Sequence, residues 1–136
     1  MVDVVALHAR VARAFERRDL AAYLALMHPD VAFTTVAFGR ERVFRGHEGV
    51  REWWEALSVR PGYDAYRASA TAIADDAVLI RARIRAPNDA GGYLDAAALW
   101  LLIVRDELVW RYRPVESEEA ARAEHARLTE SRRREG

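Results

Sequence analysis

Few side chains in this sequence have the types and spacing that a reactive centre requires. The chain has no cysteine to act as a nucleophile, no glycine-rich phosphate loop and no HExxH or comparable ligand spacing. A transition metal needs three or four converging ligands, so we predict no metal site and no cofactor. The four histidines lie far apart on different predicted elements: His8, His28, His47 and His125.

Each histidine also has an ordinary structural interpretation. His8 falls on the face of a predicted helix, which favours a packing residue over a general base. His28 and His47 lie at the ends of predicted elements, where hydrogen bonds in caps and turns are their commonest role.

One carboxylate stands alone in a predicted strand, and it is a candidate acid. Asp95 is the only acidic residue in the strand over residues 93–104. Regular alternation places Ala96 and Ala98 on the inner face of the sheet and Asp95 on the outer face, although a register slip of one residue inverts this. On the outer face Asp95 would pair with arginines of a neighbouring strand, and these are Arg81, Arg83 and Arg85.

Hydrophobic spacing predicts the helices and strands that carry these residues. Helical spacing covers residues 4–15, and a short second helix is expected after the N-cap residue Asp19 and before Pro29. A strand over residues 31–38 follows, rich in Val, Phe and Thr. A third helix is then marked by the spacing of Val50, Trp53, Trp54 and Leu57.

The second half of the chain changes from a period of 3.6 to a period of 2. Four successive strands are predicted over residues 63–73, 78–86, 93–104 and 108–113, with a last helix beginning near Ser117. This order predicts an α+β fold, with helices on one side of a curved, mostly antiparallel sheet. We expect one domain over residues 1–130 and a disordered tail over residues 131–136.

Composition narrows the class of protein further. The 136 residues carry no net charge, and 51% of them are hydrophobic. Binding to nucleic acid or to anionic membranes relies on a surplus of basic residues, so neither is expected as a partner. No apolar run reaches the roughly 18 residues of a membrane span, and the N-terminus lacks the pattern of a signal peptide. We therefore expect a cytoplasmic domain.

Three segments resemble a known family. Residues 18–20 and 28–31 resemble the "GDL…DPDV" opening of the nuclear transport factor 2-like superfamily. Residues 44–54 (FRGHEGVREWW) are similar to the "YRGHEGVRRWW" segment of its SnoaL-like, or polyketide cyclase-like, branch. Residues 104–113, followed by Glu118, Glu119 and Ala120, resemble "LRDGKVVRWR…EEA". Together these segments cover nearly the whole chain.

The resemblance implies a cone-shaped half-barrel. In this fold a strongly curved sheet and three helices from the N-terminal half of the chain enclose an apolar cavity, and a C-terminal helix follows. It also implies a homodimer, for which the outer face of the sheet is the expected surface. That face would carry Arg111 and Arg113 of the last strand. It would also carry Arg81, Arg83 and Arg85.

Two activities of the family lack their residues here. Ketosteroid isomerases use an Asp base with an oxyanion hole of Tyr and protonated Asp. The positions that correspond to these groups hold Thr35, Val11 and Ala98 in this sequence. The position that corresponds to the last-strand Asp of limonene-type epoxide hydrolases lies near Pro114. We therefore expect neither ketosteroid isomerisation nor epoxide hydrolysis by the residues that the family uses for them.

The resemblance still implies a cavity with a few polar groups. We predict that it binds a small hydrophobic or polycyclic molecule, as a cofactor-independent isomerase, cyclase, dehydratase or hydrolase. A non-catalytic ligand-binding or dimeric interaction module is the alternative. Tyr112 and Thr35 are the expected hydrogen-bond donors, and Asp95, His28 or Glu116 the expected proton acceptor. The expected apolar lining consists of Val11, Phe15, Met27, Phe33, Trp54, Ile80, Ala82, Ile84, Ala96 and Ala98; alternatively, these side chains fill a closed core.

Overall fold

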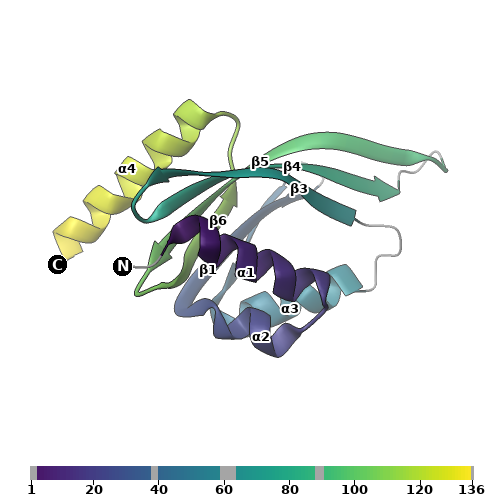
Figure 1. Cartoon of the computed structure of the whole chain (residues 1–136), viewed down its shortest axis with the longest axis horizontal. Helices are drawn as coiled ribbons and strands as arrows, with labels where there is room; N and C mark the ends of the chain where they lie inside the picture. The colour runs from purple at the N-terminus through teal and green to yellow at the C-terminus, as the bar shows by residue number, and fades with distance from the viewer. Residues whose placement is uncertain (1–2, 38–39, 59–63, 88–90, 136) are drawn as a thin grey trace.

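The helices and strands follow the predicted order, with one additional strand. The computed structural model describes residues 3–37, 40–58, 64–87 and 91–135 (Figure 1). The elements in chain order are α1 (Val4–Glu16), α2 (Leu20–Ala25), β1 (Met27–Ala37), β2 (Arg40–Arg45), α3 (Gly46–Ser58), β3 (Asp64–Ala74), β4 (Ala77–Pro87), β5 (Tyr93–Arg105), β6 (Leu108–Pro114) and α4 (Glu118–Glu135).

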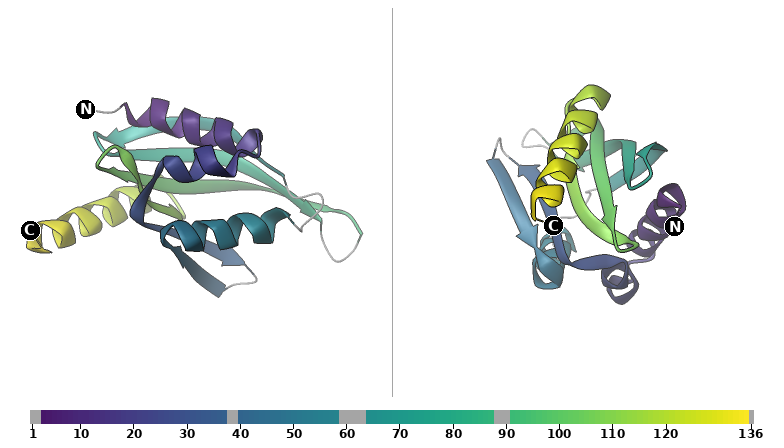
Figure 2. Two further views of the ribbon diagram at one scale, coloured as in Figure 1. Left: turned by 90° about the horizontal axis from the view of Figure 1, so that it is seen from below. Right: turned by 90° about the vertical axis from the view of Figure 1, so that its left-hand side faces the viewer.

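A single six-stranded sheet forms the centre of the molecule, in the order β2-β1-β6-β5-β4-β3. Only β1 and β6 run parallel to each other, so the sheet is mostly antiparallel, as predicted. The sheet is curved and does not close, and α1, α2 and α3 lie on its concave side (Figure 2). This is the α+β, cone-shaped half-barrel that the sequence predicts.

Two separate hydrophobic cores hold the layers together. The larger core lies between the concave face and the first three helices, and it includes Leu7, Phe33 and Leu102. The smaller core lies on the opposite face of the sheet, where α4 packs over Leu79 and Leu101 through side chains that include Ala121 and Leu128. The C-terminal helix therefore covers part of the outer face (Figure 1).

The helices begin where their capping residues predict. The Asp19 carboxylate accepts a hydrogen bond from the Ala22 amide at 3.1 Å, and the Ser117 hydroxyl oxygen accepts one from the Ala120 amide at 3.0 Å. The Asp3 carboxylate does the same for Val5 at 3.0 Å at the start of α1. In the part of the chain that the structure describes, no helix is long and apolar enough to cross a membrane.

Three boundaries differ from the prediction. β1 begins at Met27, and Pro29 lies within it because the pairing with β6 is irregular between Met27 and Ala32, where no ladder donor is required. β2 was not predicted because its charged residues hide the strand pattern, as is common in edge strands. α4 continues to Glu135 through the predicted disordered tail, which contains no proline or glycine before residue 136.

Candidate functional site

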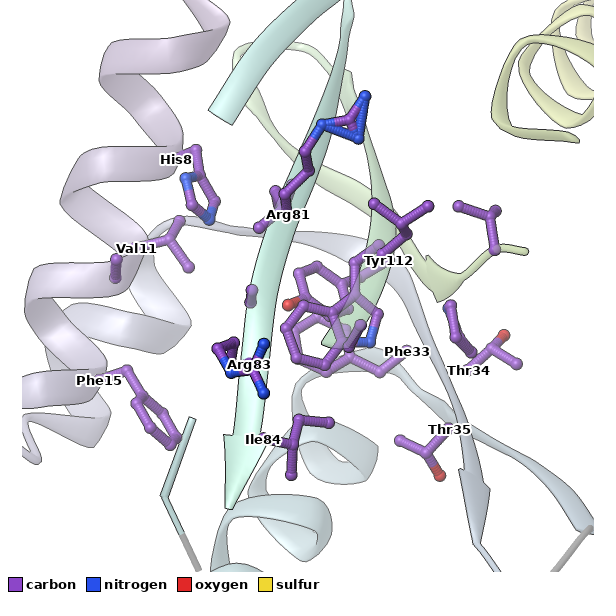
Figure 3. Close-up of a pocket in the computed structure, with 18 of the residues that line it drawn as sticks. His8, Val11, Phe15, Phe33, Thr34, Thr35, Arg81, Arg83, Ile84 and Tyr112 are labelled. Atoms are coloured by element: carbon purple, nitrogen blue, oxygen red, sulfur yellow. The ribbon is translucent and has the colours of Figure 1, made fainter. Parts of the chain in front are cut away.

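A cavity of about 910 Å³ lies between the first three helices and the concave side of the sheet. Its walls come from α1, α2, α3, β1, β4, β5, β6 and the segment after β6. Figure 3 shows side chains of α1 and of the strands projecting around one space. The described residues that line the cavity are His8, Val11, Ala12, Phe15, Glu16, Tyr23, Phe33, Thr34, Thr35, Trp53, Ile80, Arg81, Ala82, Arg83, Ile84, Ala97, Ala98, Leu99, Trp100, Tyr112, Pro114, Val115 and Glu116.

Aromatic rings from six elements form much of the wall. Tyr112 stacks on Phe33 with ring centroids 5.0 Å apart, and it lies 6.0 Å from the ring of Trp100. Tyr23 stacks on Trp53 at 6.0 Å. Rings packed in this way present flat, rigid, apolar faces, and such faces suit an aromatic or polycyclic ligand.

Small residues on two central strands leave the space open. Ala82 on β4 is the direct partner of Ala98 on β5, and both line the cavity. Ile80 and Ile84 flank this pair on β4. Because alanine side chains extend only one carbon from the sheet, the middle of the concave face is not filled by its own side chains.

The charged side chains of the wall are exposed to solvent, whereas one imidazole of the wall is buried. Glu16, Arg81, Arg83 and Glu116 are exposed. His8, in contrast, is only 5% exposed. The cavity thus has charges where it meets solvent and an imidazole in its buried part.

Tyr23 is the second buried ionisable group of the wall, at 3% exposed. Burial raises its pKa well above the ordinary value, and the neighbouring Tyr112 adds to the shift. The Tyr23 hydroxyl therefore keeps its proton to a higher pH than an exposed tyrosine does.

The cavity brings together ten of the residues proposed from the sequence. They come from segments that are far apart in the chain, and Figure 3 labels several of them. They are Val11, Phe15, Phe33, Thr35, Ile80, Ala82, Ile84, Ala98, Tyr112 and Glu116.

Three proposed lining residues lie elsewhere among the described residues. Met27 is 1% exposed and belongs to the core, and Ala96 is not part of the cavity wall. Trp54 packs in the core, with its ring 5.1 Å from Tyr23, whereas its neighbour Trp53 lines the cavity. Consecutive residues on a helix point about 100° apart, so only one of the two indoles faces the cavity.

His28 also lies away from the cavity. Its Nδ1 accepts a hydrogen bond from the Asp30 amide at 2.9 Å, so Nε2 carries the proton and donates to an Asp106 carboxylate oxygen at 3.2 Å. Both ring nitrogens are thus engaged in contacts that join the start of β1 to the β5–β6 turn. This is the structural role that its position at the end of an element favours, and it leaves His28 without access to a ligand in the cavity.

Asp95 lies opposite Arg85 in the register of β5 and β4. Its side chain lies outside the described part of the structure.

The arginines of the outer face meet partners within the chain. Exposed Arg81 and Arg83 alternate with buried Ala82, as predicted. A guanidinium nitrogen of Arg81 lies 3.5 Å from Glu118 of α4, and one of Arg113 lies 2.9 Å from Glu124 of α4. Arg81 and Arg113 thus pair with acids of α4, which packs on this face, and the expected contacts with a second protomer stay a prediction.

His8, Tyr23 and Trp53 are among the cavity residues that were not proposed from the sequence. A signal existed for His8, which precedes Val11 by three residues and Phe15 by seven and so shares their helical face. His8 is buried, as a packing residue would be, and this face of the helix also borders the cavity. Within the described residues, no three His, Asp or Glu side chains gather in a way that could hold a metal ion.

The fold and the cavity define a family. The model of the SnoaL-like domain family matches residues 8–112, and the chain belongs to this family within the nuclear transport factor 2-like superfamily. A comparison with curated proteins found no match to this sequence.

Solved structures share the fold at low sequence identity. A Burkholderia pseudomallei protein of unknown function, described as NTF2-like, is 17% identical with a TM-score of 0.71, covering 94% of this chain and 98% of its own. TerC, co-crystallised with polyporic acid, is 18% identical with a TM-score of 0.68, covering 88% of this chain and 95% of its own. RV0760c from Mycobacterium tuberculosis, in complex with estradiol-17beta-hemisuccinate, is 15% identical with a TM-score of 0.63, covering 84% and 93%. At these identities the likeness shows the fold alone.

Proposed function

We propose that this protein binds a small aromatic or polycyclic molecule in the cavity of its cone. The observation that carries the proposal is a cavity of about 910 Å³ whose wall is largely aromatic and apolar. This volume lies within the range typical of small-molecule sites, which are lined by hydrophobic side chains with a few placed polar groups. The multi-ring compounds bound by TerC and RV0760c support the same class of ligand.

The polar groups of the wall fix the orientation of the ligand. Tyr112 and Thr35 donate hydrogen bonds to its oxygen atoms, and Glu116 at the exposed part of the wall accepts one. If the protein catalyses a reaction of its ligand, these donors stabilise a developing oxyanion and Glu116 accepts the proton. That chemistry needs no cofactor and suits an isomerase, cyclase, dehydratase or hydrolase.

A titration with a neutral polycyclic probe tests the binding function. N-phenyl-1-naphthylamine becomes fluorescent in apolar surroundings, and we expect saturable enhancement that steroid-like compounds reverse by competition. Quenching of tryptophan fluorescence should accompany binding because Trp53 and Trp100 line the cavity. No saturable response to the probe or to a panel of steroid-like and polyketide-like compounds would refute the proposal.

A plugging variant localises the binding. In Ala98→Phe the new ring projects into the cavity beside Ala82, and we expect affinity to fall at least about fivefold, as clashes of about 1–3 kcal/mol imply. Ala72→Phe is the matched control, since Ala72 is an exposed strand residue outside the cavity wall. Equal loss in both variants would contradict binding in the cavity.

The non-catalytic alternative shares this cavity and differs only in turnover. Product formation from a bound ligand, lost in Tyr112→Phe but with probe affinity kept, would identify an enzyme. A homodimer through the outer face of the sheet and a cytoplasmic location complete the proposal.

A further inference from the structure

One histidine lies in the buried part of the cavity wall. His8 is on α1 and is 5% exposed. Figure 3 shows it on the same side of α1 as Val11 and Phe15, with its imidazole directed toward the strands. A ligand that fills the cavity between α1 and the sheet meets this ring.

The other ionisable side chains of the wall are carboxylates, phenols and guanidinium groups. Imidazole is the side chain whose ordinary pKa falls between 5 and 8, whereas carboxylates titrate below this range and phenols and guanidinium groups above it. The described titratable and charged groups that line the cavity with His8, from α1, α2, β4, β6 and the segment after β6, are Glu16, Tyr23, Arg81, Arg83, Tyr112 and Glu116. His8 is the one imidazole among the described residues of the wall.

We propose that the cavity selects aromatic ligands that carry an acidic oxygen, such as a carboxylate, enolate or phenolate, and that His8 recognises this group. The inference rests on the proposed binding function and names the ligand class for the same cavity. A buried anion is costly unless a donor or a cation compensates it, and protonated imidazole supplies both. Because His8 is only 5% exposed, water screens this interaction little.

Two fluorescent probes of similar ring structure test this selection. 1-Anilinonaphthalene-8-sulfonate is an anion throughout pH 5.5–8, whereas N-phenyl-1-naphthylamine lacks the sulfonate and stays neutral. We expect the anionic probe to bind about fivefold more tightly at pH 5.5 than at pH 8, since hydrogen bonds to charged groups exceed neutral ones by about 1 kcal/mol. The neutral probe should show the same affinity at both values.

Variants assign the effect to His8. His8→Gln keeps a hydrogen-bonding side chain that does not titrate, so the anionic probe should lose its pH dependence while the neutral probe still binds. His125→Gln is the matched control, because His125 pairs with Asp76 at 2.7 Å outside the cavity, and it should behave like the unaltered protein. An anionic probe that keeps its pH dependence in His8→Gln would overturn the inference.

A measurement on the unaltered protein tests the inference without depending on whether a variant folds. NMR titration of the four imidazole rings should show the His8 pKa rising on saturation with the anionic probe and not with the neutral one. An unchanged His8 titration would overturn the inference even when the neutral probe binds. Failure of the neutral probe to bind would instead remove the proposed binding function.

Discussion

The Tyr23 hydroxyl group is held away from water by the aromatic rings of the cavity wall. Phe33 and Trp53 lie 6.1 and 6.0 Å from its ring, and the residue is 3% exposed. Burial disfavours the phenolate form, and this is the main cause of its raised pKa. The side chain consequently couples the stability of the fold to alkaline pH.

Replacing this residue should alter the alkaline stability of the protein. An unfolded tyrosine ionises near pH 10, whereas folded Tyr23 keeps its proton, so the free energy of unfolding falls as pH rises from 10 toward the folded pKa. In Tyr23→Phe we expect the free energy of unfolding to fall less steeply with pH. The difference in slope corresponds to about one bound proton. Urea denaturation between pH 9 and 11 measures the difference. Equal slopes in the two proteins would contradict it.

At the residue scale, sequence reasoning found the apolar lining better than the polar groups. Val11 and Phe15 follow from helical spacing because an amphipathic stripe faces the interior wherever the helix packs. His28 was proposed from the sequence as a site residue and does not line the cavity, whereas His8 was not proposed and does. The contacts that occupy His28 come from Asp106, which is 78 residues away, and no local pattern contains that information.

At the scale of elements, the β5–β6 connection shows how local chemistry sets the register of a hairpin. Asp106 and Glu107 form a two-residue turn between the strands, and both have positive φ, 55° and 64°. Two-residue turns of this kind match the twist of the strands but favour glycine or asparagine at positive φ. Glu107 adopts this conformation at a steric cost.

Removing the steric strain at Glu107 in this turn should stabilise the protein. Glu107→Gly removes the Cβ clash at positive φ, and we expect a gain of about 1 kcal/mol in the free energy of unfolding. Asp75→Gly is the control in the β3–β4 turn, where φ is not positive, and there glycine should bring no gain. Urea denaturation of both variants checks the contrast. A loss of stability in Glu107→Gly would show that the turn is not strained.

Element order and most strand boundaries were predictable because spacing and turn residues are local signals. β3 to β6 end within about two residues of their expected limits. β2 was missed because it is an edge strand, and the partner that holds it is β1 across the Ala32–Arg45 pair. Its residues carry charges where a central strand would be apolar.

At the scale of the whole molecule, the two faces of the sheet differ in what covers them. The three N-terminal helices close the concave face around the cavity, whereas α4 covers only one end of the outer face (Figure 1). Exposed Arg85 lies farther along β4, beyond the core under α4. This remaining surface is the one through which we expect two protomers to associate.

Light scattering after size-exclusion chromatography tests the association. We expect the mass of a homodimer, and we expect Arg85→Glu to shift the protein toward monomer because it reverses a charge at the proposed interface. Arg10→Glu, an exposed change on α1, is the control and should leave the mass unchanged. A monomeric unaltered protein at all concentrations would contradict the proposed dimer.

The sequence by itself determined the family, the α+β order of elements and the apolar character of the lining. These follow from periodicity, capping residues and turn chemistry, each of which acts over a few residues. Only the tertiary structure decided that Trp53 and His8 face the cavity, that His28 does not, and that α4 covers the outer face. Such outcomes depend on how a helix is rotated about its axis and on which distant strands pair, and these are set by packing across the whole fold.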